Sequence, residues 1–191
     1  MYQKLKAFLA QFVPLTEEEF GFFAAQLHVT RLRAKEIWQL EGEIGTKLAF
    51  VNQGLLRHYY SKGDEEVTAQ FYFESDWVGD LISYLIQEPS KMNIQALEDT
   101  ELFVLFIRDI EAIFEKIPLL EKFDRLFTQR RAIELYHREY SFLVDSPEER
   151  YLNLLQKRPD LVEKIPQYYL AQYLGIRPES LSRIRKRLGH T

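Results

Sequence analysis

Hydrophobic positions change their spacing along the 191-residue chain. Up to about residue 28 they recur at intervals of three and four, as at Phe20, Phe23 and Leu27, which is typical of helices. Thr16 is followed by three glutamates, and the helix dipole favours carboxylates in a first turn. We therefore predict a helix that begins after Thr16.

From about Val29 the pattern becomes one of short apolar or alternating runs separated by turn residues. Such runs, at a spacing of roughly eight to twelve residues, predict the short strands of a barrel, sandwich or jelly roll. Glycines punctuate the region at positions 42, 54, 63 and 79. The stretch SKGDEE predicts a hairpin with Gly63 and Asp64 in its tight turn.

Helical spacing returns near Asp109, with a short helix to Ile117 and a longer one from Pro118. The long helix carries an apolar stripe with heptad spacing, interrupted by Arg130 and His137. This stripe could pack on the chain's own domain or on a second copy, and we favour a dimer interface. Its members are Leu119, Phe123, Leu126, Ile133 and Tyr140.

A boundary is predicted near Val144, because Ser146 and Pro147 have the features of an N-cap and a first helical residue. Three short helices are expected after it, at about 147–157, 166–174 and 178–188. The predicted parts are a β-roll with flanking helices (1–117), a long helix and hinge (118–144) and a C-terminal helical domain (145–191). The predicted fold class is α+β.

The last two predicted helices form a pair joined by a turn at Gly175, where glycine permits a positive φ. Leu170 and Leu174 share the inner face of the first helix, and Ala171 is small where a second helix crosses. In the second helix Leu181 and Ile184 face inward, whereas the opposite face is polar and largely cationic.

Such a cationic face suits a recognition helix in the major groove of DNA. Arginine can donate two hydrogen bonds to guanine, glutamate can accept from cytosine, and lysine suits phosphates. The plainer interpretation is the solvated face of an ordinary helical hairpin, but the small residue, the glycine turn and the basic face together favour DNA. The predicted DNA-contacting residues are Arg177, Glu179, Ser180, Ser182, Arg183, Lys186 and Arg187.

Charge supports a separate C-terminal module. The whole chain carries a net charge of −4, yet residues 156–191 hold 8 Lys and Arg against 3 Asp and Glu. The chain has no cysteine, which excludes disulfides and cysteine nucleophiles. It has no apolar run long enough to span a membrane and no signal-type start, so we expect a cytoplasmic protein with no membrane partner.

The sequence gives little support for a metal site or for an enzyme activity. The four histidines, His28, His58, His137 and His190, fall in different predicted elements, so no metal site is predicted even though a cupin-like roll could host one. His137 could respond to pH at an interface, although packing is the simpler role. Paired carboxylates lie at turns or helix starts, and no catalytic motif is present, so no enzyme is predicted.

The chain resembles the Crp/Fnr family of transcription regulators, and most closely its Bacteroidetes-type branch. The resemblance rests on IPQYYLAQYLGIRPESLSRIRKRL, on the glycine spacing from LEGEIG to WVGDL, and on IQALEDTELFVL. It implies a cyclic-nucleotide-binding-like roll, a dimerisation helix and a C-terminal helix-turn-helix. It also implies a homodimer on a palindromic operator, with RNA polymerase as a further partner. Glu179 and Arg183 match the family's base-reading positions, and Ser180 matches a hydroxyl contact.

The family's phosphate cassette is altered here. Its Gly-Glu-Leu element reads Gly79-Asp80-Leu81, and its phosphate-binding arginine aligns with Ser90 or Lys91. Serine cannot form the bidentate fork that arginine offers, and lysine gives only a point charge. We therefore expect an effector other than cyclic AMP and predict no cofactor. The alternative function is an effector-sensing or protein-docking roll whose basic tail binds DNA without sequence preference.

Overall fold

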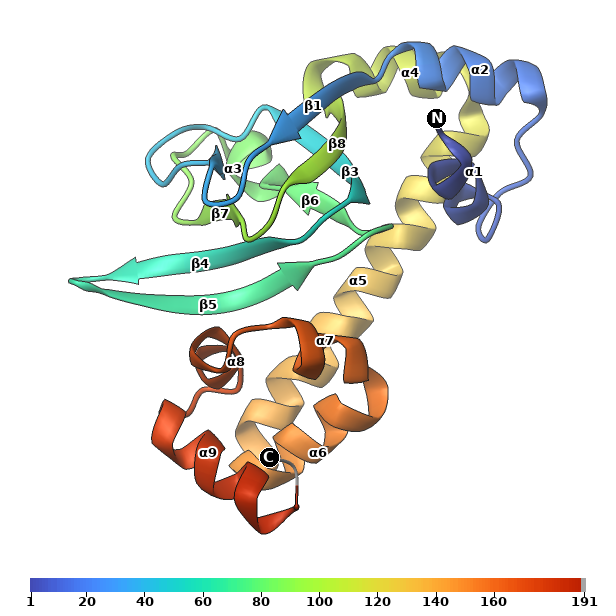
Figure 1. Cartoon of the computed structure of the whole chain (residues 1–191). Coiled ribbons are helices and arrows are strands. Elements are labelled where there is room, and N and C mark those ends of the chain that lie inside the picture. Colours follow the sequence, from blue (N-terminus) through green and yellow to red (C-terminus); the bar gives the residue numbers. More distant parts are fainter. Residues whose placement is uncertain (190–191) are drawn as a thin grey trace.

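The computed structural model describes residues 1–189, apart from the side chain of Asp160. It has the predicted α+β architecture, with an antiparallel β-roll, flanking helices and a long helix that leads to a group of short helices (Figure 1). The helices that precede and follow the roll are α1 (Gln3–Leu9), α2 (Glu17–Ala25), η1 (Ile107–Asp109), α4 (Ile110–Lys116), α5 (Pro118–Val144), α6 (Pro147–Lys157), α7 (Pro159–Lys164), α8 (Gln167–Tyr173) and α9 (Pro178–Arg187).

Two four-stranded antiparallel sheets form the roll. The first has the order β1-β8-β3-β6, with β1 (His28–Leu32), β8 (Thr100–Phe106), β3 (Lys47–Gln53) and β6 (Trp77–Gly79). The second has the order β2-β7-β4-β5, with β2 (Ile37–Gln39), β7 (Asn93–Ala96), β4 (Leu56–Lys62) and β5 (Glu65–Tyr72). Helix α3 (Leu81–Ile86) follows β6.

The helix start and the hairpin turn that were predicted from local sequence are both present in the structure. Thr16 caps α2, where its Oγ1 accepts the Glu19 N–H at 3.2 Å and the Glu19 side chain returns the bond in a capping box. In the β4–β5 hairpin Lys62 pairs with Glu65, so Gly63 and Asp64 form the two-residue turn. These two predictions, one of a helix start and one of a turn, needed only residues close in sequence.

Two short helices were missed by the sequence prediction. Residues 145–189 contain four helices rather than three, because α7 (Pro159–Lys164) lies in the interval predicted to connect the first two. Pro159 lies in the first turn of α7, where a missing N–H costs nothing. Helix α3 is also only six residues long, too short to show a helical period.

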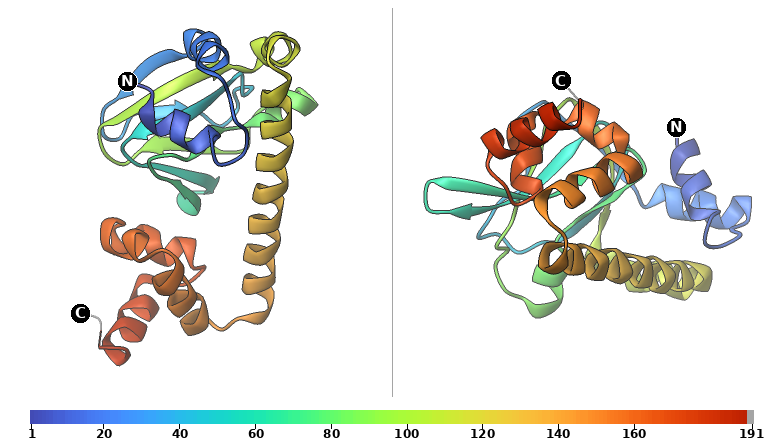
Figure 2. Two further views of the ribbon diagram at one scale, coloured as in Figure 1. Left: turned by 90° about the vertical axis from the view of Figure 1, so that its right-hand side faces the viewer. Right: turned by 90° about the horizontal axis from the view of Figure 1, so that it is seen from below.

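Three clusters of buried side chains hold the fold together. One fills the space between the two sheets, and a second joins the first sheet to α1, α2 and the start of α5. The third contains side chains of α6, α7, α8 and α9, and it joins these helices to Leu55, Phe71 and Phe73 of the roll. The C-terminal helices therefore pack against the β4–β5 hairpin, and the left view in Figure 2 shows them returning from the end of α5 toward the sheets.

Candidate functional site

The α8–α9 pair has the tight turn that its sequence predicted. Gly175 has φ of 68°, and its N–H donates to the Gln172 carbonyl at 2.9 Å. A Cβ at Gly175 would lie 2.8 Å from a ring carbon of Phe142, so both the backbone conformation and the neighbouring ring favour glycine here. Leu170 and Leu181 are fully buried between the helices, which leaves the other face of α9 toward solvent.

That outer face carries the side chains that were predicted to contact DNA. Six are exposed and Ser180 is half-buried; the exposed ones are Arg177, Glu179, Ser182, Arg183, Lys186 and Arg187. Arg183 donates to Ser180 Oγ at 3.2 Å. Arg187 forms an ion pair with Glu148 of α6, so part of its charge is already met within the chain. Arg177 is the N-cap residue of α9 and makes no capping bond through its side chain.

The residues aligned with a phosphate cassette are held by other contacts. Asp80 is 5% exposed and caps α3, with Oδ1 accepting the Ser83 N–H at 3.0 Å. Ser90 is 3% exposed, and its Oγ both donates to the Met92 carbonyl and accepts from the Met92 N–H at 3.1 Å. Lys91 is exposed to solvent. The Asp80 carboxyl group and the Ser90 hydroxyl group, which align with the cassette, thus both have hydrogen-bond partners within the chain.

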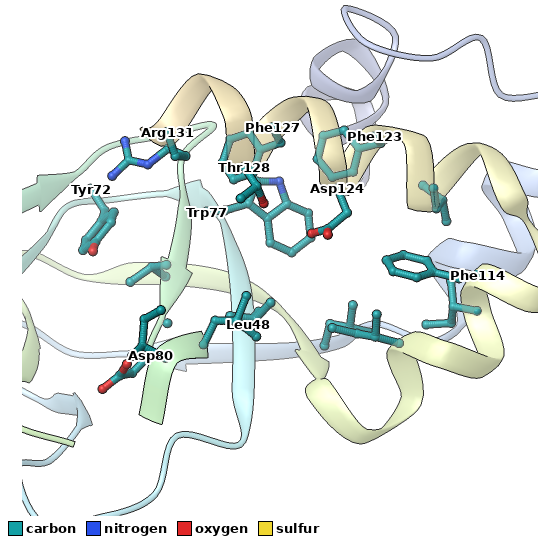
Figure 3. Close-up of a pocket in the computed structure, with 18 of the residues that line it drawn as sticks. Leu48, Tyr72, Trp77, Asp80, Phe114, Phe123, Asp124, Phe127, Thr128 and Arg131 are labelled. Atoms are coloured by element: carbon teal, nitrogen blue, oxygen red, sulfur yellow. The ribbon is translucent and has the colours of Figure 1, made fainter. Parts of the chain in front are cut away.

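A cavity of about 320 Å³ lies between the first sheet and α5, and Figure 3 shows its walls. Gly79, Asp80 and Leu81 line it, whereas Ser90 and Lys91 do not. The predicted pocket residues are therefore only partly brought together. Gly79 has φ of 149°, and a Cβ there would lie 2.6 Å from the Lys47 carbonyl oxygen, so the backbone beside this wall is tightly packed.

Helix α5 supplies polar cavity residues that the sequence analysis missed. Asp124, Thr128 and Arg131 line the cavity and point from α5 toward the sheet (Figure 3). Their spacing of four and three residues places them on one helix face, beside the apolar stripe. That spacing is visible in the sequence, on a face adjoining the apolar stripe that predicts the dimer interface. Burial raises the pKa of Asp124 above its ordinary value.

The predicted dimer stripe divides into two halves. Phe123 is 9% exposed and Leu119 is partly buried, and both pack in the cluster that joins α5 to the chain's own roll. Phe123 is therefore not available to a second copy in this arrangement, because its own domain covers it. Leu126 is half-buried. Ile133 and Tyr140 are 58% and 52% exposed, so the second half of the stripe is open.

A buried arginine, Arg57 of β4, was also missed by the sequence analysis. It is 1% exposed, and its Nη2 contacts Glu66 at 2.7 Å and Gln95 at 3.0 Å. Its guanidinium lies between the rings of Tyr59 and Tyr169, at 4.1 Å and 4.0 Å from their centroids. Tyr169 belongs to α8, so this arginine lies where the roll meets the C-terminal helices.

Within residues 1–189, no group of three or more histidine or acidic residues is arranged to hold a metal ion. His190, which the sequence analysis considered, lies outside the described residues. No helix of the described chain combines the length and apolar character needed to cross a membrane.

Comparisons with known proteins agree with this geometry. Residues 29–117 match the family described as Cyclic nucleotide-binding domain. A search of the curated proteins found no match. Among solved structures, a CooA mutant from Carboxydothermus hydrogenoformans has a TM-score of 0.69 at 19% identity, covering 88% of this chain and 80% of its own.

Two further structures extend the similarity over nearly the whole chain. The c-di-GMP responsive global regulator CLP of Xanthomonas campestris has a TM-score of 0.69 at 16% identity, with 91% of this chain and 92% of that chain covered. A regulator assigned to the Crp/Fnr family from Eubacterium rectale has a TM-score of 0.65 at 20% identity, with 94% and 88% covered. The chain therefore has a cyclic-nucleotide-binding-type roll within the fold of Crp/Fnr transcription regulators. Both of these neighbours are described as regulators.

Proposed function

We propose that the protein is a homodimeric transcription regulator of the Crp/Fnr type that reads DNA through α9. The observation that carries the proposal is the exposed face of α9, where Glu179, Arg183 and Lys186 project from a helix pair with a tight glycine turn. A helix with such a face can enter the major groove and contact base edges, while its cations meet phosphates. As a DNA reader the protein would act in the cytoplasm, with RNA polymerase as a further partner.

The decisive experiment is selection of bound fragments from genomic DNA of the source organism. Wild type is compared with Arg183→Ala and with Arg33→Ala, which removes an exposed arginine at the end of the roll's first strand. A specific reader enriches a palindrome that is lost in Arg183→Ala and kept in Arg33→Ala. Loss of a base contact should cost about 1–3 kcal/mol at that site.

The alternative is a sensing or docking roll whose basic C-terminal part binds DNA without sequence preference. The close packing of α8 on β5, where Thr68 Oγ1 donates to Gln172 Oε1 at 2.6 Å, favours a helical unit fixed on the roll. In that case the selection yields no motif, and residual binding falls equally with salt in both arginine variants.

For the dimer, we propose contacts through the exposed half of the α5 stripe. Ile133 and Tyr140 lie there, and Leu135, Tyr136 and Leu143 are also exposed on α5, at 57%, 63% and 79%. Exposed apolar side chains of this number on one helix suit a partner helix. Sedimentation should show weaker dimers for Ile133→Gln than for Glu139→Gln, an exposed position on the same helix.

For the roll, we propose that it senses an effector other than cyclic AMP, in the cavity beside α5. Asp80 is committed to capping α3, and the Ser90 hydroxyl to Met92, so neither is free for a ribose or a phosphate. Calorimetry with cyclic AMP tests this directly. Micromolar binding would overturn it.

A further inference from the structure

The cavity beside α5 has walls made mainly of apolar and aromatic side chains. A volume of about 320 Å³ lies at the lower end of the range for small-molecule sites and fits a compact one- or two-ring molecule. Two of its rings, Phe123 and Phe127, stack with centroids 5.6 Å apart, and Trp77 lies 6.4 Å from Phe123. The six aromatic lining residues are Phe23, Tyr72, Trp77, Phe114, Phe123 and Phe127.

One carboxylate in this cavity has no partner. Asp124 projects from α5 into the space between Trp77 and Phe114, as Figure 3 shows. Its carboxylate makes no hydrogen bond or ion pair with any residue in the part of the chain that the structure describes, and it remains open to solvent at the rim. An acceptor-only group among aromatic rings is suited to a ligand that donates a proton or carries a positive charge.

The remaining charges in the cavity point to the same sign of ligand. Asp80 adds a second carboxyl group to the wall, although its Oδ1 accepts the Ser83 N–H and caps α3. Arg131 is the one cation among the lining residues, which all lie within the described range. Its Nη1 is 2.7 Å from Glu134 Oε2, and Glu134 also contacts Arg130 Nε at 3.2 Å, so the charge of Arg131 is partly met on α5. A phosphate or carboxylate ligand would therefore meet the unpaired carboxylate of Asp124, with an arginine whose charge is already shared.

Aromatic rings add to the attraction for a cation. A ligand ammonium placed over the face of a phenylalanine or tryptophan ring is attracted by the ring quadrupole, most strongly where water is excluded. Phe123 and Phe127 occupy positions one residue before and three residues after Asp124, so they flank its carboxylate on the same helix. The carboxylate and the rings thus offer a combined site for one positively charged nitrogen.

We infer that this cavity binds a small aromatic amine in its protonated form, with the ring in the apolar cavity and the ammonium on Asp124. This ligand has the opposite charge to a cyclic nucleotide. The amine's role as an effector rests on the proposed function, whereas its binding does not, because binding is measured without DNA.

The binding test uses a matched series of probes on the full chain. 2-Phenylethylamine, 2-phenylethanol and phenylacetate share a ring and a short arm but differ in charge. Titrations are followed by calorimetry, and by tryptophan fluorescence in a Trp38→Phe background, which leaves Trp77 at the cavity wall as the reporter. The amine is expected to bind at least about tenfold more tightly than the alcohol, as for hydrogen bonds to a charged group.

Two variants assign the preference to one side chain. Asp124→Asn should lower amine affinity about tenfold and leave alcohol affinity unchanged, because the neutral amide keeps the shape but not the charge. Glu121→Gln, which removes an exposed carboxylate from the same helix outside the cavity, should change neither. Thr128→Trp at the cavity wall should abolish binding of both probes, with circular dichroism confirming that each variant is folded.

Several results would overturn the inference. These are tighter binding of phenylacetate than of the amine, equal binding of amine and alcohol, full amine affinity in Asp124→Asn, or no binding of any probe at millimolar concentration. The DNA arm is read separately, as the affinity for a selected fragment with and without the amine. If the amine binds but DNA affinity does not change, the site stands and its role as a regulatory switch is overturned. If no fragment is selected at all, the proposed function fails independently of the binding result.

Discussion

Tyr169 of α8 stacks on the guanidinium of Arg57 of β4, with the Arg57 Cζ 4.0 Å from the ring centroid. Arg57 is 1% exposed and has hydrogen-bonding partners only at Nη2 among the described residues, since Nε and Nη1 are buried without any. Burying a cation so incompletely paired is costly unless ring faces replace part of its hydration. Docking of the C-terminal helices therefore stabilises the buried Arg57, because it brings the Tyr169 ring onto the guanidinium.

Tyr169→Leu should loosen the C-terminal helices from the roll. The change keeps an apolar side chain but removes the ring, and we expect a loss of about 1–2 kcal/mol from a desolvated cation–π contact. Limited proteolysis near Asp145, between α5 and α6, measures the effect. Tyr168→Leu is the matched control, because Tyr168 is 54% exposed and its ring packs edge-on against Tyr169, whereas the rings on Arg57 are those of Tyr59 and Tyr169. Equal cleavage of the two variants would contradict the prediction.

His58 should make the protein less stable as the pH falls below neutral. Burial lowers the pKa of His58 to about 4, and its Nε2 has no hydrogen-bond partner. The unfolded chain takes up the proton near pH 6.5, so the folded state binds fewer protons between pH 6.5 and 4. The free energy of unfolding is therefore highest above pH 6.5. It decreases by on the order of 3 kcal/mol as the pH falls toward 4.

Urea unfolding at pH 7.5, 5.5 and 4.5 tests the role of His58. His58→Gln should show a smaller loss of stability over this range than wild type, although it is less stable at pH 7.5. His28→Gln serves as the control, because His28 is exposed at the start of β1. A pH dependence that is the same in wild type and His58→Gln would assign the effect to other groups.

The parts of the fold that depend on neighbours in sequence could be predicted from the sequence. Thr16 and Ser146 cap their helices as expected, and each is joined to a glutamate three residues later in a capping box. Gly175 adopts the positive φ that its turn requires. Such features follow from backbone geometry within a few residues, so no knowledge of the distant chain was needed.

Long-range contacts could not be predicted in the same way. Thr68 and Gln172, which join the roll to α8, are 104 residues apart, and nothing in either local sequence indicates the other. Arg57 lies in a strand whose alternation gave no reason to expect a buried cation. Phe123 was assigned to a dimer stripe because heptad spacing identifies an apolar face and not the surface that covers it. In the structure its own roll covers that side chain.

Gly175→Ala should destabilise the α8–α9 pair. Alanine is strained at φ of 68°, and its Cβ would lie 2.8 Å from Phe142. Gly189→Ala separates the two causes, because Gly189 has φ of 74° but nothing within 4 Å of its Cβ position. We expect a cost of about 1 kcal/mol for strain alone and a larger loss at Gly175. Thermal unfolding followed by circular dichroism compares the two, and similar midpoints would mean that Phe142 moves aside easily.

Glu148→Gln should strengthen DNA binding at low salt. Glu148 of α6 forms an ion pair with Arg187 of α9. This ion pair neutralises part of the positive charge of the proposed DNA face. Glutamine releases that charge and also removes a carboxylate from beside the phosphates, so affinity for any DNA fragment should rise several-fold. The slope of log affinity against log salt should steepen by about one phosphate contact, because one more counterion is released. Filter binding across a salt series measures both quantities.

Glu163→Gln on α7 removes an equal charge from an exposed position with no ion pair to α9, and it should leave the slope unchanged. If both variants steepen the slope equally, the change reflects net charge and not the release of Arg187.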